Sequence, residues 1–319
     1  MVVTGGSGFI GTNLIESYVL SGDEVLNFDV EPPRNPRHRH LWRAIDCRNR
    51  SDLGGALESA SPDYIFHLAA RTDLGGQTDE DYAANTTGTA NLCAAVPRCR
   101  GLKHVVFASS LLVCRPGYRP KHETDYLPTT AYGRSKMISE QIVRAAPELG
   151  CRWTIVRPTH IWGPWFRAPY RDFFTMIGRG FYIHPRVENL RKAFGFVGNV
   201  VYQLKRIAEG ESADHLTLYV TDYEPLEVGC WAEAIAREMK VRKPLQAPLS
   251  LLRAVAKIGD FAGTVGGYNA PLTSFRLNNL LTETVVDLGM TKTICGPLPY
   301  TPQEGVRMTV EWLRCNPAT

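Results

Sequence analysis

The sequence lacks the features that mark a membrane-spanning, secreted or nucleic-acid-binding protein. No uninterrupted apolar stretch is long enough to cross a bilayer, and no signal-peptide pattern opens the chain. The 36 basic and 32 acidic residues leave a net charge of only +4, and there is no long basic run or RNA-binding motif. We therefore expect a cytoplasmic protein that has neither a nucleic-acid nor a membrane partner.

The eight cysteines lack any pairing or metal-binding pattern. No two of them form a Cys-x-x-Cys pair, and none combines with histidine at zinc-ligand spacing. Scattered cysteines of this kind are typical of reduced, buried thiols. The sequence therefore predicts neither a disulfide framework nor a metal site.

Apolar strands alternate with amphipathic helices in the first half of the chain, which is typical of a parallel α/β sheet. The predicted strands are residues 1–4, 24–29, 64–68, 104–109 and 153–157, and the predicted helices are 9–20, 79–95 and 131–146. This alternation predicts a Rossmann-type, doubly wound parallel sheet over residues 1–158.

The character of the sequence changes after Pro158. Residues 162–185 are rich in aromatic residues, proline and glycine, and indicate a loop with a short helix. Further on, the pattern predicts helices at 197–208, 226–239, 250–262 and 302–313, and a strand at 216–220. We interpret residues 159–319 mainly as a smaller substrate-binding lobe, from which residues 197–222 return to the sheet.

A glycine-rich turn joins the first strand to the first helix. Residues 4–11 read Thr-Gly-Gly-Ser-Gly-Phe-Ile-Gly, which spaces Gly5, Gly8 and Gly11 three apart. Glycine lets the backbone approach a pyrophosphate, and the helix N-terminus offers free N–H groups and a positive dipole. Asp29 ends the second strand, where an acidic side chain binds the adenosine ribose. The pattern predicts a dinucleotide site.

Asp29 also bears on the choice between NAD and NADP. A carboxylate accepts hydrogen bonds from a ribose 2′-hydroxyl and repels a 2′-phosphate, which favours NAD. A basic stretch follows that offers the alternative of an NADP phosphate site, although a solvated loop explains it better. Its members are Arg34, Arg37, His38, Arg39, His40 and Arg43.

Tyr132 and Lys136 are four residues apart, so on a helix they share one face. A neighbouring ammonium and a cationic nicotinamide ring favour the phenolate, which can take a proton from a substrate hydroxyl. A tyrosine and a lysine at this spacing also occur on exposed helices that have no catalytic role, so the spacing alone does not predict a site. The apolar strand that ends in Ser109 and Ser110 supplies the context, because ligands of open α/β sheets bind at the carboxyl ends of strands. Ser110 is placed to bind the reacting oxygen, whereas Ser109 also fits the role of a serine that caps a helix or a turn.

The order of these motifs resembles the extended short-chain dehydrogenases/reductases, and among them the NAD-dependent epimerase/dehydratase family that acts on nucleotide sugars. The resemblance covers about half of the chain. It rests on the loop at residues 4–11, Asp29, Asp46, His67-Leu68-Ala69-Ala70, Asn85-Thr86-Thr87-Gly88-Thr89, Ser109-Ser110, Tyr132-x-x-x-Lys136, Arg157-Pro158 and Trp162-Gly163-Pro164.

The resemblance implies a role for each matching residue. Cofactor contacts are implied for Gly5, Gly8, Phe9, Ile10, Gly11, Asp29, Asp46, Ala69, Ala70, Asn85, Ser109, Lys136 and Pro158. Catalysis is implied for Ser110, Tyr132 and Lys136. Substrate contacts are implied for Ser110, His160, Arg191, Lys192 and Arg276. Of these, Asp46 is expected at the adenine, and either Lys192 or Arg191 at a substrate diphosphate, for which Arg276 is a weaker candidate. The family also implies a homodimer through helices 79–95 and 131–146.

Three departures from the family pattern concern the substrate more than the cofactor. Residues 113–115 read Val-Cys-Arg, residues 197–199 read Val-Gly-Asn, and His160 replaces a family asparagine. An imidazole there either lines the pocket or serves as a second acid/base, since histidine titrates near neutral pH. Leu111 and Leu112 stand where sugar 4,6-dehydratases of the family carry an Asp-Glu pair, which argues against dehydration.

The sequence thus favours a nucleotide-sugar epimerase or a 4-keto-sugar reductase, with a nucleotide-diphosphate sugar as substrate. Two alternatives stay open. One is a dehydrogenase of a non-nucleotide, steroid-like alcohol, and the other is a non-catalytic NAD(P)-binding regulator. The presence of Ser110, Tyr132 and Lys136 argues against the regulator.

Overall fold

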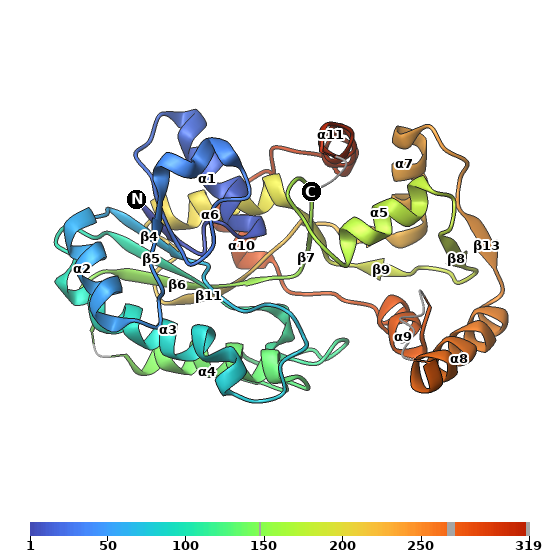
Figure 1. Ribbon diagram of the computed structural model, residues 1–319, viewed down its shortest axis with the longest axis horizontal. Helices are drawn as coiled ribbons and strands as arrows, with labels where there is room; N and C mark the ends of the chain where they lie inside the picture. The colour runs from blue at the N-terminus through green and yellow to red at the C-terminus, as the bar shows by residue number, and fades with distance from the viewer. Residues whose placement is uncertain (147, 267–271, 317–319) are drawn as a thin grey trace.

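Seven parallel strands make up the central sheet, in the order β3-β2-β1-β4-β5-β6-β11 (Figure 1). The computed structural model describes residues 1–146, 148–266 and 272–316 of the chain. The strands are β1 (Val2–Thr4), β2 (Leu26–Asp29), β3 (Trp42–Ala44), β4 (Tyr64–His67), β5 (His104–Ala108), β6 (Arg152–Pro158) and β11 (Leu216–Val220). Strand order reverses between β1 and β4, so their carboxyl ends flank the crevice where such sheets bind ligands. The predicted doubly wound parallel sheet is confirmed.

Helices cover both faces of this sheet (Figure 1). One layer holds α1 (Phe9–Ser21), α6 (Val197–Glu209) and α10 (Gly289–Cys295), and the other holds α2 (Arg50–Ala60), α3 (Ala83–Ala95) and α4 (Ala131–Ala145). Strand residues such as Val105, Val106 and Val156 are fully buried because both faces are covered. Burial of each such side chain stabilises the fold by about 1.5–3 kcal/mol.

Two short elements of the sheet half were not predicted, namely β3 and α2. Leu53 and Leu57 are the fully buried apolar anchors of α2, and the helix carries two glycines, so its amphipathic pattern is weak. The formation of helix α2 therefore depends on packing against distant residues rather than on its local sequence pattern.

The second half forms a lobe beside the sheet, at the right of Figure 1. Its strands are β7 (His160–Trp162), β8 (Ile183–Pro185), β9 (Arg191–Lys192), β10 (Phe194–Phe196), β12 (Leu226–Glu227) and β13 (Leu245–Ala247). Its helices are α5 (Tyr170–Gly178), α7 (Val228–Met239), α8 (Leu249–Gly266), α9 (Ser274–Leu281) and α11 (Pro302–Cys315). Short 3-10 turns lie elsewhere in the chain, at η1 (Pro36–Leu41), η2 (Glu80–Tyr82), η3 (Val96–Arg98) and η4 (Leu111–Val113).

Aromatic side chains form the core of the lobe. Trp231 of α7 packs against Phe194 and Trp162, with ring centroids 4.5 and 5.2 Å apart. The predicted helix at 226–239 begins only at Val228, because Leu226 and Glu227 pair with β9 instead. Within the described parts of the chain, no helix combines the length and apolar character needed to cross a bilayer.

Candidate active site

The β1–α1 turn is too tightly packed for side chains at two of its glycines. Gly5 has a φ of 74°, and a Cβ there would lie 2.4 Å from the backbone nitrogen of Ala69. A Cβ on Gly11 would lie 2.5 Å from the Gly5 carbonyl oxygen. The turn therefore holds α1 directly against the segment that follows β4, where Ala69 and Ala70 lie.

Gly8 leaves the N-terminus of α1 open. It is the N-cap residue and contributes no side-chain hydrogen bond, so no capping side chain covers the first-turn N–H groups, which include those of Phe9 and Ile10. A Cβ on Gly8 would meet only the Gly5 oxygen, at 3.1 Å. A helix N-terminus bared in this way fits a diphosphate.

Asp29 lies at the end of β2, beside this turn. Its Oδ2 accepts a hydrogen bond from the Ser7 N–H and its Oδ1 accepts one from the Glu31 N–H, both at 3.0 Å. Burial raises the pKa of this carboxyl, and the backbone donors oppose that effect. Each oxygen keeps a lone pair for a ribose hydroxyl. Asp46, in the loop before α2, pairs instead with Arg48, at 2.7 Å.

Much of the basic stretch after Asp29 is bound by the protein itself. Arg34 donates to the Trp165 carbonyl at 2.7 Å, and burial lowers the pKa of Arg34 to about 10. His38 is buried against Glu16, at 2.5 Å. Arg43 donates to the carbonyls of His40 and Trp42. These contacts leave fewer cations for a 2′-phosphate than the sequence suggests.

Ser110, Tyr132 and Lys136 lie together at the carboxyl end of β5. All three are buried, and Lys136 donates from Nζ to the Ala108 carbonyl at 2.7 Å. Burial lowers the pKa of Lys136 to about 8. Burial also raises the pKa of Tyr132, and a hydrogen bond with Ser110 partly offsets this.

Helix α4 approaches this site closely because of its first turn. Thr130 caps the helix by accepting the Gly133 N–H at 3.0 Å. A Cβ on Gly133 would lie 2.2 Å from the Leu112 carbonyl oxygen. Only glycine therefore lets α4 pack against η4, which brings Tyr132 next to Ser110.

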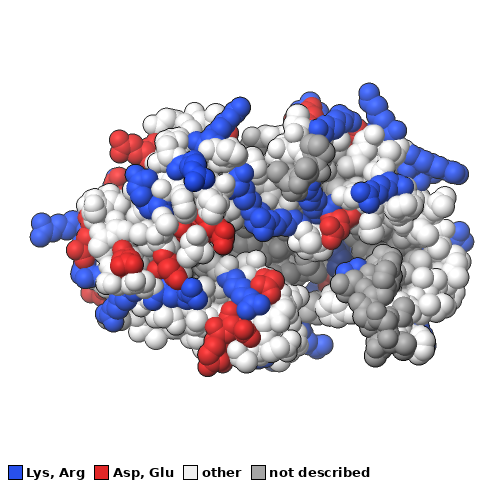
Figure 2. Space-filling model, in the orientation of Figure 1, with Lys and Arg blue, Asp and Glu red and all other residues white. Residues whose placement is uncertain are grey.

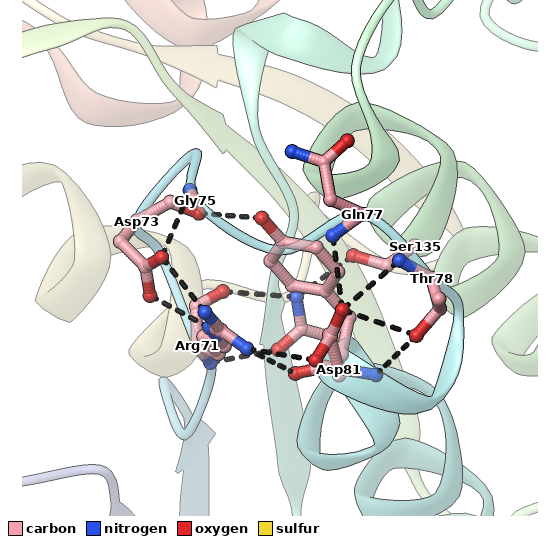
Figure 3. Close-up of polar contacts among 9 residues, drawn as sticks. Arg71, Asp73, Gly75, Gln77, Thr78, Asp81 and Ser135 are labelled. Carbon is pink, nitrogen blue, oxygen red and sulfur yellow. Dashed lines mark hydrogen bonds and ion pairs between the residues drawn. The ribbon is translucent and has the colours of Figure 1, made fainter.

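Polar contacts hold the loop after β4 together (Figure 3). Arg71 pairs with Asp73 at 2.8 Å and with Asp81 at 3.4 Å. Tyr82 donates its hydroxyl to the Asp73 carbonyl, and its ring lies 6.0 Å from that of Tyr132. The loop therefore supplies a buried aromatic wall beside Tyr132.

Asn85 holds this loop to α4. Its Oδ1 accepts the Arg71 N–H at 2.8 Å, and its Nδ2 donates to the Arg71 carbonyl and to Ser135 Oγ. The amide is thus bonded to the protein through both of its ends. A positioning role accounts for these contacts, and the cofactor contact expected of Asn85 stays a prediction.

A buried ion pair behind the site was not predicted. Glu140 of α4 and Arg157 of β6 have side chains 1% and 2% exposed, and their closest atoms are 2.7 Å apart. Ser109 donates to the same carboxylate at 2.5 Å, and Tyr126 donates to it at 2.9 Å. The signal for Glu140 was in the sequence, because it follows Lys136 by one helical turn.

His160 faces the lobe side of the site. Its Nδ1 bonds the Tyr170 hydroxyl at 2.7 Å, and its Nε2 lies 3.4 Å from Thr284 Oγ1. Burial, reinforced by the charge of Lys192, lowers the pKa of His160 to about 3. This shift favours the neutral imidazole, so the contacts fit a pocket residue, and the alternative role of His160 as a second acid/base stays a prediction.

The three basic residues expected at a substrate diphosphate lie in different surroundings. Lys192 is buried, and its Nζ donates to the carbonyls of Asn279 and Thr282 at 2.6 and 2.7 Å. These carbonyls lie at the end of α9, so the ammonium acts as a helix cap. Arg191 and Arg276 are exposed. The structure brings Lys192 close to His160 but leaves the two arginines on the surface.

Pro158, the remaining residue of the predicted set, ends β6 at the same edge of the sheet. Among the described residues, no group of three or more histidine, cysteine, aspartate or glutamate side chains is arranged to hold a metal ion.

Comparison with known proteins adds independent evidence. The model of the NAD dependent epimerase/dehydratase family matches residues 1–179. A 3-beta-hydroxysteroid dehydrogenase of Mycolicibacterium neoaurum is 30% identical over 250 residues, covering 72% of this chain and 67% of that protein. An N-acetyl-alpha-D-glucosaminyl-diphospho-ditrans,octacis-undecaprenol 4-epimerase of Escherichia coli O157:H7 is 26% identical, covering 98% and 94%.

Solved structures share the fold along nearly the whole chain. The UDP-glucose 4-epimerase of Thermotoga maritima with UDP-glucose has a TM-score of 0.75 at 19% identity, covering 99% of this chain and 98% of that one. The UDP-glucose 4-epimerase of Thermus thermophilus in complex with NAD has a TM-score of 0.73 at 19% identity, with 98% of both chains covered.

The buried ion pair generates a prediction about stability. Glu140→Ala leaves the Arg157 guanidinium buried without its carboxylate, so we expect the free energy of unfolding to fall by about 3–5 kcal/mol. Asp63→Ala, which breaks an exposed pair with Lys103, is the matched control and should cost about 1 kcal/mol or less. Urea denaturation measures both, and equal losses would contradict a structural role for the buried pair.

Proposed function

The chain belongs to the NAD-dependent epimerase/dehydratase family, and from this premise we propose that it transfers hydride reversibly between NAD and a secondary carbinol or ketone. The observation that carries the proposal is the burial of Ser110, Tyr132 and Lys136 together at the carboxyl end of β5. This group lies at the sheet edge from which the open N-terminus of α1 also projects.

We assign cofactor binding to the sheet half and substrate binding mainly to the lobe. The first turn of α1 would hold the diphosphate, and Asp29 would hold the adenosine ribose. When bound, NAD supplies the hydride acceptor and donor. The engaged state of Arg34 and His38 supports NAD over NADP.

Each catalytic side chain has a distinct task in this proposal. Tyr132 takes the proton from a substrate hydroxyl during oxidation and returns it during reduction. Lys136 favours the phenolate through its charge, and Ser110 orients the reacting oxygen by a hydrogen bond. Leu111 and Leu112 follow Ser110 and cannot transfer protons, so the proposal excludes dehydration.

A nucleotide-diphosphate sugar is the first candidate substrate, with epimerisation or 4-keto reduction as the reaction. Two epimerase relatives that act on diphospho-sugars match 98% and 99% of this chain. An epimerase would recycle bound NAD, whereas a reductase would consume reduced cofactor. Retention of NAD through purification, without net consumption during turnover, distinguishes the two.

A non-nucleotide, steroid-like alcohol is the second candidate, and the contacts of Lys192 favour it. Its ammonium is bound to two carbonyls of the protein, which weakens the case for a diphosphate clamp. His160, Tyr170 and Phe194 form an aromatic cluster in the lobe, with centroids 5.7 to 6.2 Å apart. The dehydrogenase relative at 30% identity agrees with this candidate. Turnover on panels of nucleotide sugars and of sterols decides between the two classes.

A homodimer is also part of the proposal. Helices α3 and α4 pack side by side on the outer face of the sheet (Figure 1), and in this family such a pair meets its copy in a four-helix bundle.

The cofactor assignment predicts the effect of removing one carboxylate. In calorimetry, the wild-type protein should bind NAD more tightly than NADP, and Asp29→Ala should narrow the difference because the repulsion of the 2′-phosphate is lost. Asp23→Ala, which removes an exposed acid just before β2, should leave the preference unchanged. A wild-type preference for NADP would overturn the assignment.

The catalytic assignment predicts a graded series of losses. Tyr132→Phe should lower kcat by about 10²–10⁴-fold with little change in NAD affinity, because only the proton carrier is removed. Lys136→Ala should reduce both rate and NAD affinity, and Ser110→Ala should reduce the rate less than Tyr132→Phe.

Tyr118→Phe is the matched control for this series, since its hydroxyl donates to the carboxylate of Asp125 and to none of the three catalytic residues. It should retain wild-type kcat. If Tyr132→Phe also retained wild-type kcat while chemistry limits turnover, the assignment of Tyr132 would be wrong.

A further inference from the structure

Helix α8 presents an apolar face to solvent. Leu251, Val255, Ile258 and Phe261 follow one another at helical spacing, and these four side chains are 44–68% exposed. We refer to them as the outer α8 face. The opposite side of the helix packs through Leu252 and Ala256 against Leu277 of α9. The helix is therefore anchored on one side and uncovered on the other.

The segment that contains this face also carries the net charge of the chain. Residues 240–261 hold five lysines and arginines and one aspartate, a net charge of 5 − 1 = +4. The whole chain has 36 − 32 = +4, so the remaining residues sum to zero. In Figure 2, Lys and Arg side chains border the lobe near α7 and β13, and the end over α8 is mostly uncharged.

We propose that the outer α8 face binds the interface of an anionic lipid bilayer, with the helix lying along the membrane surface. An amphipathic helix with basic flanks gains free energy there from apolar burial and from attraction to anionic headgroups. Arg253 and Lys257 are exposed on α8 itself, and Lys240, Arg242 and Lys243 immediately precede β13. The charge complementarity between this segment and anionic lipid selects a membrane over a second copy of the chain.

The membrane-binding helix is connected to the candidate active site. Helix α9, which packs on α8, ends at the carbonyls that hold Lys192. Thr284, three residues beyond α9, lies beside His160. Binding at the outer α8 face would therefore bring the substrate side of the site close to the lipid surface. The inference stands independently of the substrate.

Vesicle flotation of the full-length chain tests this inference. We expect the protein to float with vesicles of equal parts phosphatidylglycerol and phosphatidylcholine, and the bound fraction to fall as salt screens the charges. The double variant Ile258→Glu, Phe261→Glu should reduce the partition coefficient by about tenfold or more, because two apolar contacts with lipid are lost. Vesicles of phosphatidylcholine alone should bind the wild type weakly.

The matched control is Val19→Glu, Leu20→Glu, which places the same charges on an exposed apolar pair at the end of α1. It should float like the wild type. A milder variant, Lys257→Gln, should weaken binding to anionic vesicles about fivefold, and Lys121→Gln should not. This pair tests the charge contribution even if the double variant fails to fold.

Three results would overturn the proposal. The wild type could fail to bind anionic vesicles, or the double variant could bind them as well as the wild type does. Alternatively, light scattering could show that Ile258→Glu, Phe261→Glu dissociates an oligomer that Val19→Glu, Leu20→Glu leaves intact. That result would make the outer α8 face a contact between copies of the chain.

Discussion

A buried ammonium determines how the candidate site is assembled. Lys136 is only 4% exposed, and a charged group at that depth is stable only with close polar partners. The Ala108 carbonyl at the end of β5 accepts a hydrogen bond from its Nζ, and the charge of Glu140, one helical turn further along α4, favours the ammonium form. The hydrogen bond to Ala108 fixes the position of α4 along β5. Tyr132, one turn before Lys136, is thereby brought to Ser110.

Helix α4 also connects the site to the neighbouring strand of the sheet through Glu140. Glu140 pairs with Arg157 of β6 and accepts hydrogen bonds from Ser109 and Tyr126. Removal of one member would leave a charge buried without a partner, which is far more costly than the loss of an exposed pair. The strand ends on both sides of the site are therefore held by one connected polar group rather than by separate contacts.

The sequence predicts those parts of the fold that depend on local pattern. The strand at 216–220 has the predicted bounds, and the glycine spacing at residues 5–11 identifies the turn that the structure contains. Helix α2 escaped prediction because its stability comes from Leu53 and Leu57 packing on distant residues.

The contacts of individual side chains were harder to predict from the sequence than the positions of helices and strands. Nothing in the spacing around Lys192 shows that its ammonium caps α9, because α9 lies about ninety residues later in the chain. The outer α8 face was not predicted for a different reason. The net charge of +4 for the whole chain does not show that the excess positive charge lies in the single segment 240–261. The partner of Glu140 was hidden as well, because its spacing on the helix points to Lys136, whereas its carboxylate pairs with Arg157 of β6.

The central claim is that Tyr132 ionises beside Lys136 when NAD is bound. Ultraviolet absorbance of tyrosinate, followed as pH rises, measures this directly. In the free protein burial raises the pKa of Tyr132, so Tyr132 should stay protonated below the ordinary value of about 10. With saturating NAD, the wild type should show an additional tyrosinate signal below that value that Tyr132→Phe lacks. An identical titration of the two NAD-bound proteins would contradict the account.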